Sequence, residues 1–549
     1  MQEFEKDKWA KKAIQSPLIP ILLALLAHGM GLFNGFTFDD FADVVKHPIV
    51  NGKAPLKDIL YYHYMGGPLS QQMPTIRPLT TFIFHLEWQI WGHQPLGFHL
   101  TNLLMYCALL LLVQRTFRLF FTPVQAMWAT AFFAVQGIHV ANVASVTHRA
   151  DIQALILVLL AFHTALKDRL LLSVACYLGA LLSKESAIIM PFFLLAYWPY
   201  KEGLNMEMFK KYASKLALIG CTGFAFLLSR HWWLPITTHS IQLSKNILLD
   251  GSLELRLWAP FVILGKYIQL TFLPYHFTHS YDHQSIELFS TFKHPLGWIG
   301  ILFVFSGIIF SLLPLLRSKS HETIKQLAFG FVAFFGSYSI ISNTFFLNIV
   351  VIGERTFLIS SLWLTFLAVV GLIHFYKLLH LRKGLFLLLA IGILTVQTGS
   401  SINRTLDWKS NFTLFRALTQ THPKNVMGQF YYSQQLAVKG LHEKALWHLA
   451  LAIYGRDKYP KGYFFQAGLG EFNSHFKRRA SDWNYPFPNA GKGLSYKQKL
   501  QWIPKLVAPE KSRQKAFQYF KGIAIRYQGA SSIPILEQME QDLTLQRSE

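Results

Sequence analysis

The chain has 549 residues, of which 52% are hydrophobic and only 15% are charged. Soluble globular proteins carry roughly 25% charged residues, and a single soluble core stops growing near roughly 250–300 residues, so these values exclude one large soluble domain. The formal net charge is +23. Many of the basic residues stand in short loops between apolar stretches, which is typical of a membrane protein rather than of a nucleic-acid-binding protein.

Eleven apolar segments are predicted to cross a membrane as helices, since a crossing helix needs roughly 20 apolar residues. Basic residues gather at the N-terminus and after every second segment, which predicts a cytoplasmic N-terminus. The sequence therefore predicts eleven crossings and a C-terminus outside the cytoplasm. The segments are 17–34, 97–114, 124–139, 151–167, 169–183, 187–199, 213–230, 296–316, 326–343, 356–376 and 384–402.

A further apolar segment, 256–275, is expected to lie in the outer interface or to re-enter the membrane there. It contains Lys266 and Gln269, and a charge at the middle of a bilayer is costly. This assignment places residues 1–403 in a transmembrane catalytic domain with two long outer loops, 35–96 and 231–295. The polar, basic remainder, 404–549, is predicted to be a soluble helical domain.

The soluble domain contains one segment that fits a single tetratricopeptide repeat. Residues 424–460 are predicted to form a helical hairpin, and stable repeat arrays need about three such units. A short irregular helical domain is the alternative reading, and residues 461–549 carry no clear repeat. The hairpin pattern comes from apolar or small residues at Tyr432, Leu436, Ala445, Leu449 and Ala452.

The first outer loop holds the candidate base. Asp39 and Asp40 follow the first segment by a few residues, and a carboxylate at a membrane edge can act as a general base with a tuned pKa. The alternative is that both are solvated loop acids. Arg77, later in the same loop, is suited to a phosphate by bidentate hydrogen bonds, with interfacial snorkelling as the alternative.

Several short outer turns carry one cation beside one anion. Ionisable groups at such depth are functional candidates, and a structural ion network is the alternative. Walker, HExxH and nucleophile-elbow motifs are absent from the sequence, and no metal-ligand cluster is evident. An acid with scattered cations suits a substrate whose leaving group is a phosphate fixed in the bilayer. The paired residues are Arg149 with Asp151, Lys184 with Glu185, and Glu354 with Arg355.

An ordered set of motifs resembles a known family. The motifs are FDDFADVVKHP, RPLTTFIFHLEWQIWG, GFHLTNLL, GIHVANVASVTHRADIQAL, LLSKES, GERTFLIS and RTLDWKSNFTLF. Together they resemble the transmembrane-and-tetratricopeptide-repeat O-mannosyltransferases and their bacterial relatives, within the C-type glycosyltransferase (GT-C) superfamily. The resemblance implies a multi-pass α-helical bundle of about eleven transmembrane helices, with a polyprenyl-phosphate-linked sugar as substrate and no certain cofactor.

The resemblance also implies residue roles. Asp39 would be the base and Asp40 its neighbour, while Arg149, Arg355 and, less closely matched, Arg77 would bind the donor phosphate. Their partners Asp151, Lys184, Glu185 and Glu354 would support them. The chain departs from the family at Gly137, where relatives usually have His or Pro, and in its shorter repeat region.

The resulting prediction is a mannosyltransferase-like enzyme that moves a sugar to an acceptor hydroxyl by inverting attack. Protein Ser or Thr is the expected acceptor, and a lipid or glycan acceptor is an alternative. A lipid-linked sugar transporter or flippase and a membrane-anchored scaffold are alternatives from other classes. The expected partners are the bilayer, the lipid-linked sugar and the acceptor, without nucleic acid. The expected location is a bacterial inner membrane with the site facing the periplasm, or else the lumen of the endoplasmic reticulum.

Overall fold

The computed structural model describes residues 16–441, apart from gaps at 70–74, 234–245, 247, 249–252, 282–293, 317–320, 346, 349, 381, 424 and 440. Beyond 441 it describes only residues 445, 448 and 452. The chain divides into two compact units. Unit 1 comprises Met1–His279 and Glu287–Leu414, and unit 2 comprises Ser280–Ile286 and Phe415–Glu549. Most of the second half of the predicted hairpin and all of 461–549 lie outside the described residues.

Unit 1 is built from helices, and its described part contains no strand. Each of the eleven predicted segments overlaps one of these helices, so their helical conformation is confirmed. The helices are α2 (Leu18–His28), α3 (Pro78–Trp91), α4 (Pro95–Phe117), α5 (Pro123–Ala134), α6 (Val140–Ala144), α7 (Arg149–Leu166), α8 (Leu170–Ser183), α9 (Met190–Glu202), α10 (Met206–Trp233), α12 (Leu253–Phe272), α13 (Pro295–Leu316), α14 (Glu322–Tyr338), α15 (Leu358–Leu378) and α16 (Lys383–Asp407).

Six stretches of helix in the described part are long and apolar enough to cross a membrane: Pro95–Phe117, Arg149–Leu166, Met206–Trp232, Pro295–Pro314, Glu354–Leu378 and Lys383–Asp407. The chain is therefore a multi-pass helical membrane protein, and the count of eleven crossings stays a prediction. The segment 256–275 forms most of α12, in which Lys266 is 9% exposed and donates a 3.0 Å hydrogen bond to Gln269. Its interfacial placement is likewise still a prediction.

Local sequence fixes several helix starts. Proline occupies the first helical position of α3, α4 and α5, where its missing N–H costs no hydrogen bond. Helices adjacent in sequence pack in pairs, such as α7 with α8, α12 with α13, and α14 with α15. At the α12–α13 contact, a Cβ on Gly265 would meet the Leu296 carbonyl oxygen at 2.0 Å. Only glycine permits this approach of the two backbones.

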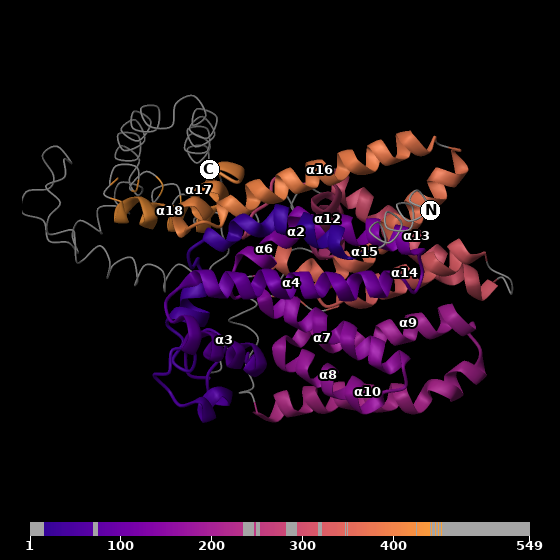
Figure 1. Ribbon diagram of the computed structural model, residues 1–549, viewed down its shortest axis with the longest axis horizontal. Coiled ribbons are helices and arrows are strands. Elements are labelled where there is room, and N and C mark those ends of the chain that lie inside the picture. The colour runs from indigo at the N-terminus through magenta and orange to yellow at the C-terminus, as the bar shows by residue number, and fades with distance from the viewer. Residues whose placement is uncertain are drawn as a thin grey trace, which may run out of the picture. The chain divides into compact units, whose positions relative to one another are not determined.

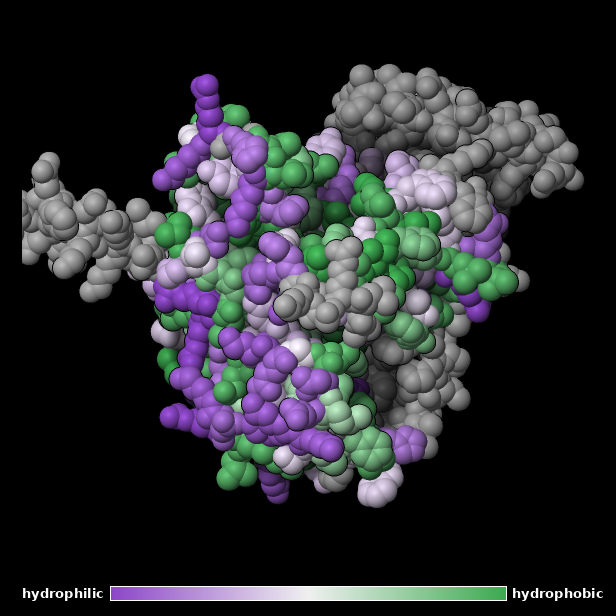
Figure 2. Space-filling view, turned by 90° about the vertical axis from the view of Figure 1, so that its right-hand side faces the viewer, coloured by the Kyte–Doolittle hydropathy of each residue, from purple (hydrophilic) through white to green (hydrophobic). Residues whose placement is uncertain are grey.

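The two ends of the unit 1 bundle differ. One end carries α3 and α6, and the opposite end carries the connection from α9 to α10 (Figure 1). Hydrophilic side chains gather at the α9–α10 end (Figure 2). Exposed basic residues flank the connection itself: Lys201 lies in the last turn of α9, and Lys210 lies near the start of α10. The candidate site residues described next belong to the α3–α6 end.

Unit 2 contains the last described helix, α18 (Val426–Val438). The rings of Phe415 and Tyr431 stack at 4.9 Å between centroids. The side chain of Asn425 donates a 3.1 Å hydrogen bond to the carbonyl oxygen of Ser280. The first helix of the predicted hairpin is therefore present, and the repeat assignment stays a prediction.

Candidate active site

The backbone just before Asp39 is held in an unusual conformation. Phe38 has φ of 42°, a left-handed value that is rare for a bulky residue and common near functional sites. Its N–H donates a 2.7 Å hydrogen bond to the side chain of Asn411. The ring of Phe38 packs against a buried cluster that includes Trp408. Trp408 and Asn411 of the RTLDWKSNFTLF motif therefore hold Phe38, and with it the neighbouring Asp39, although they lie about 370 residues later in the sequence.

Asp39 meets two cationic or basic side chains from distant segments. Arg355, in the short 3₁₀ helix η6 (Glu354–Phe357), places Nη1 3.2 Å from Oδ2 of Asp39. His148, at the N-cap of α7, places Nε2 3.8 Å from the same oxygen. Arg355 Nη1 also contacts His148 Nε2. We call Asp39, His148 and Arg355 the Asp39 cluster.

The hydrogen bonds of His148 define its protonation. Its Nδ1 lies 3.0 Å from the Ala141 carbonyl oxygen, which can only accept, so Nδ1 carries a proton. Its Nε2 faces Arg355, which can only donate, so Nε2 is an acceptor. The imidazole is therefore neutral. Burial and the charge of Arg355 lower the pKa of His148 to about 4, in agreement with this assignment.

The Asp39 cluster also keeps its carboxylate ionised. Burial acts to raise the pKa of Asp39, but His148 in its protonated form, present only below about pH 4, and Arg355 outweigh it and lower the pKa from 3.8 to about 2. The side chains of Asp39 and Arg355 remain 21% and 31% exposed. A partly open carboxylate beside an arginine can take a proton and can place a phosphate close to the atom that attacks.

Asp40 has a different surrounding from its neighbour. It is fully buried, and its carboxylate accepts hydrogen bonds from the N–H and hydroxyl of Thr37, the hydroxyl of Ser145 and the N–H of Thr147. Burial raises the pKa of Asp40 to about 6. Asp40 therefore joins the first loop to the segment before His148, which suits a positioning role.

Arg149 points into the protein. It is fully buried, and Nη1 pairs with Glu87 at 2.5 Å. Its Nε donates to Asn102 at 2.5 Å and its Nη2 to the Phe98 carbonyl at 2.7 Å. None of these partners belongs to the Asp39 cluster. The structure therefore brings Arg355, but not Arg149, to Asp39.

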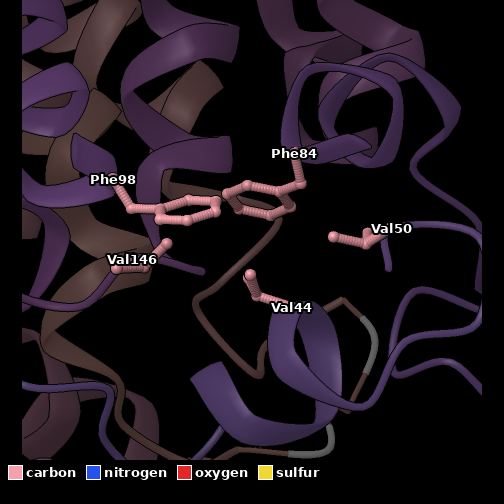
Figure 3. Close-up of a cluster of buried hydrophobic side chains, with 5 residues drawn as sticks. All are labelled: Val44, Val50, Phe84, Phe98 and Val146. Atoms are coloured by element: carbon pink, nitrogen blue, oxygen red, sulfur yellow. The ribbon is translucent and has the colours of Figure 1, made fainter. Parts of the chain in front are cut away.

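An apolar cluster contacts this buried arginine through the ring of Phe84. The rings of Phe84 and Phe98 point toward each other, with Val44, Val50 and Val146 around them (Figure 3). The guanidinium of Arg149 lies 4.7 Å above the Phe84 ring. The cluster joins η2 (Phe41–Val45), α3 and α4 to Val146, which lies two residues before His148. It therefore supports the loop that carries Asp39.

The remaining predicted residues form ion pairs near the site. Arg77 lies 3.6 Å from Glu185, and Lys184 lies 2.5 Å from Asp151. Glu354 is 3% exposed, accepts from the Thr278 N–H at 2.6 Å and pairs with Arg404 at 3.4 Å. The charged neighbours named from the sequence therefore do not pair with each other, and each pairs with a residue of another segment. Glu354 anchors the turn from which its neighbour Arg355 reaches Asp39.

Two residues of the site were missed by sequence reasoning. His148 stands in the THRAD motif, directly before the arginine that was chosen. Asp43 is 6% exposed and lies four residues after Asp39, to whose carbonyl oxygen its N–H donates. The sequence did offer a signal for each: His148 directly precedes Arg149, and Asp43 follows Asp39 by four residues, which is about one helical turn. In the described part of the chain, no group of three or more His, Cys, Asp or Glu side chains is placed to hold a metal ion.

Comparison with known proteins identifies relatives. The chain is 31% identical over 172 residues to a protein O-mannosyl-transferase of Caenorhabditis elegans, covering 30% of this chain and 25% of that one. It is 34% identical over 178 residues to Tmtc1 of Drosophila melanogaster, covering 30% and 20%. With human TMTC4 the identity is 22% over 505 residues, covering 80% and 65%. The chain is related to the TMTC protein O-mannosyl-transferases.

The resemblance seen in the motifs is thereby confirmed. The chain spans a fifth to a quarter of the length of the first two relatives. No family model matches it, and no solved structure matches it either.

Proposed function

We propose that this TMTC-like protein is a glycosyltransferase that moves a sugar from a polyprenyl-phosphate donor to a hydroxyl of a protein Ser or Thr. The observation that carries the proposal is the Asp39 cluster, in which a partly exposed carboxylate and a guanidinium meet at one end of a membrane bundle. Its relatives are named protein O-mannosyl-transferases. The reaction would take place on the non-cytoplasmic side, which the loop charges predict for this end of the bundle.

The proposed reaction needs one base and one cation. Asp39 removes the proton of the acceptor hydroxyl, whose oxygen forms a bond to the anomeric carbon of the sugar. The bond from that carbon to the phosphate oxygen breaks, and the lipid phosphate leaves with the electron pair. Arg355 offsets the charge that develops on the phosphate. Phosphate is already a good leaving group, so a separate acid is not required.

Arg355 is the preferred phosphate ligand because of its surroundings. Arg149 donates to three partners inside the protein, and Arg77 is paired with Glu185. Arg355 is exposed by 31% and its carboxylate partner is the proposed base itself. The bilayer would align the donor by holding its lipid chain while the phosphate reaches Arg355.

The test is a transfer assay with purified full-length protein in lipid nanodiscs. Radiolabelled polyprenyl-phosphate mannose and a Ser/Thr-rich acceptor peptide are incubated with the protein. The proposal predicts labelled peptide with wild type and a large loss with Asp39→Asn. Polyprenyl-phosphate glucose and a lipid acceptor are run in parallel. Transfer with none of these pairs, from protein that binds them, would refute the proposal.

The relatives favour one of the two expected compartments. The three relatives named above come from a worm, a fly and a human, so they give no support to the expected bacterial inner membrane. The lumen of the endoplasmic reticulum is the alternative that agrees with animal relatives. Either location has the site on the non-cytoplasmic side of the membrane.

A further inference from the structure

A second group of polar side chains adjoins the Asp39 cluster. Asp43, in η2, donates its backbone N–H to the Asp39 carbonyl at 2.9 Å, so it lies one helical turn after Asp39. Its carboxyl interacts electrostatically with Asp39 and with Arg77. Arg77 in turn lies 4.2 Å above the ring of Tyr64 and 3.6 Å from Glu185. We call Asp43, Tyr64, Arg77 and Glu185 the Asp43 cluster.

Three polar atoms of this cluster are buried and make no hydrogen bond with the described residues: Asp43 Oδ1, Arg77 Nε and Glu185 Oε2. The last two face each other at 3.6 Å, which is too long for a hydrogen bond. Buried polar atoms in native proteins almost always have partners. Because three of them occur together, and Asp43 is only 6% exposed, the cluster is suited to a ligand that provides the missing hydrogen bonds.

The charges of the Asp43 cluster favour an uncharged ligand. Burial acts to raise the pKa of Glu185, but Arg77 lowers it to about 2, so this pair is ionised and balanced. Burial and the neighbouring charge of Asp39 raise the pKa of Asp43, which favours its neutral form. A phosphate would meet two acidic side chains here. Sugar hydroxyls both donate and accept, which suits a carboxyl, a guanidinium N–H and a carboxylate together.

The position of the cluster agrees with that ligand. The side chains of Arg77 and Glu185 are 17% and 37% exposed, so the cluster reaches the protein surface. Tyr64 interacts electrostatically with Asp39, Asp43 and Arg355 as well as with Arg77. A phosphate at Arg355 would therefore leave its attached sugar next to these groups.

We infer that Asp43, Arg77 and Glu185 form a subsite that binds hydroxyl groups of the donor's sugar, beside the phosphate held by Arg355. The inference rests on the proposed function and gives Arg77 a sugar-binding role in place of a phosphate-binding one. It separates recognition of the donor into two parts. Arg355 recognises the lipid phosphate, and the Asp43 cluster recognises the sugar.

The experiment compares two ligands on full-length protein in nanodiscs. One is the sugar-bearing polyprenyl phosphate that wild type binds most tightly among mannose, glucose and N-acetylglucosamine forms, and the other is polyprenyl phosphate without sugar. Asp43→Ala is expected to weaken binding of the sugar-bearing lipid about tenfold, equivalent to about 1.4 kcal/mol. It is expected to leave binding of the bare lipid unchanged. Arg355→Gln is expected to weaken binding of both lipids.

Matched variants make the result specific. Asp43→Asn keeps a donor and an acceptor at this place and should retain most of the affinity. Asp58→Ala changes an acid of the same outer segment, in η3 (Leu56–Tyr61), and should change neither ligand. If Asp43→Ala does not fold, Glu185→Gln carries the same expectation, since it removes the charge but keeps the shape.

The outcomes separate the subsite from the proposed function. If wild type binds both lipids and Arg355→Gln loses both, but Asp43→Ala and Glu185→Gln leave the ratio of the two affinities unchanged, the subsite is wrong and the proposed function stands. In that case ordered water alone would hydrogen-bond to the buried polar atoms of the Asp43 cluster. If wild type binds neither lipid, the proposed function is wrong and the subsite falls with it.

Discussion

Arg355 Nη1 lies 3.2 Å from Asp39 Oδ2, although the two residues are 316 positions apart in the chain. In the proposed reaction Asp39 takes the proton of the attacking hydroxyl, and Arg355 stabilises the phosphate that leaves. A donor phosphate at Arg355 would compete with Asp39 for the guanidinium and add a negative charge nearby. Both effects raise the pKa of Asp39 above its ligand-free value of about 2 and make it a better base.

Replacing the proposed base tests its chemical role. Asp39→Asn removes the proton acceptor but keeps the shape of the side chain. General-base catalysis contributes roughly 100-fold to 10,000-fold, so transfer should fall by at least about 100-fold, while thermal unfolding stays close to wild type. Asp58→Asn serves as the matched control. Transfer at the wild-type rate in Asp39→Asn would show that another group takes the proton.

The two arginines should respond differently. Arg149→Met leaves Glu87 buried without its cation, which should lower the free energy of unfolding by about 3–5 kcal/mol. Arg355→Gln should leave stability nearly unchanged and weaken binding of bare polyprenyl phosphate. Chemical denaturation and lipid binding are measured for both. The double variant Glu87→Leu/Arg149→Met should recover stability. If Arg149→Met is stable but cannot bind the lipid, Arg149 is a phosphate ligand and the assignment to Arg355 alone is wrong.

His148 is expected to orient Arg355 rather than to transfer protons. His148→Ala removes the acceptor that faces Arg355 Nη1, so affinity for bare polyprenyl phosphate should fall about tenfold, which corresponds to about 1.4 kcal/mol. The maximal transfer rate with saturating donor should change less than the affinity. His93→Ala, an exposed histidine beside Trp88, is the control. Unaltered lipid affinity in His148→Ala would argue against the orienting role.

Asp40 gives a prediction for the pH dependence of stability. Its pKa is raised from 3.8 to about 6 by burial, so folding favours its protonated form. That contribution is complete below pH 3.8 and is lost as the pH rises through about 6. Relative to Asp40→Asn, wild type should lose up to about 3 kcal/mol over this interval, since each pKa unit corresponds to about 1.4 kcal/mol.

The measurement for Asp40 is thermal unfolding of both proteins between about pH 4 and 7, which spans the titration. Other titrating groups affect both proteins alike, so the difference in melting temperature isolates Asp40. As the pH rises, the melting temperature of wild type should fall relative to that of Asp40→Asn. A difference that is constant, or that grows in favour of wild type, would contradict the assignment.

The sequence predicted the helices and named Asp39 and Arg355 among the candidate site residues, but it did not indicate which side chain at a helix start faces the site. A long apolar run identifies a membrane helix by its length alone, whichever face of the helix is buried. At a helix start, however, neighbouring side chains point about 100° apart, so one of His148 and Arg149 faces the site and the other faces the interior. The residue pattern does not decide which. The same ambiguity applies to Asp39 and Asp40, and there the choice of Asp39 as base agrees with its exposure.

Asp43 and the buried network of Arg149 depend on tertiary contacts. Glu87, Asn102 and Phe98 stand 47 to 62 residues from Arg149 in the sequence, so its burial has no local signal. Asp43 looks like an ordinary loop acid until η2 places it one turn from Asp39. The long-range placement of charge, rather than secondary structure, is what the sequence alone left undetermined.

The most direct test of the central claim is an electron cryomicroscopy structure of Asp39→Asn with bound polyprenyl-phosphate sugar, a variant expected to hold the donor without turnover. The account predicts the phosphate within about 3 Å of the Arg355 guanidinium, a hydrogen-bonding distance for charged groups, with the anomeric carbon facing residue 39. A phosphate bound elsewhere on the protein, out of contact with Arg355, would contradict it.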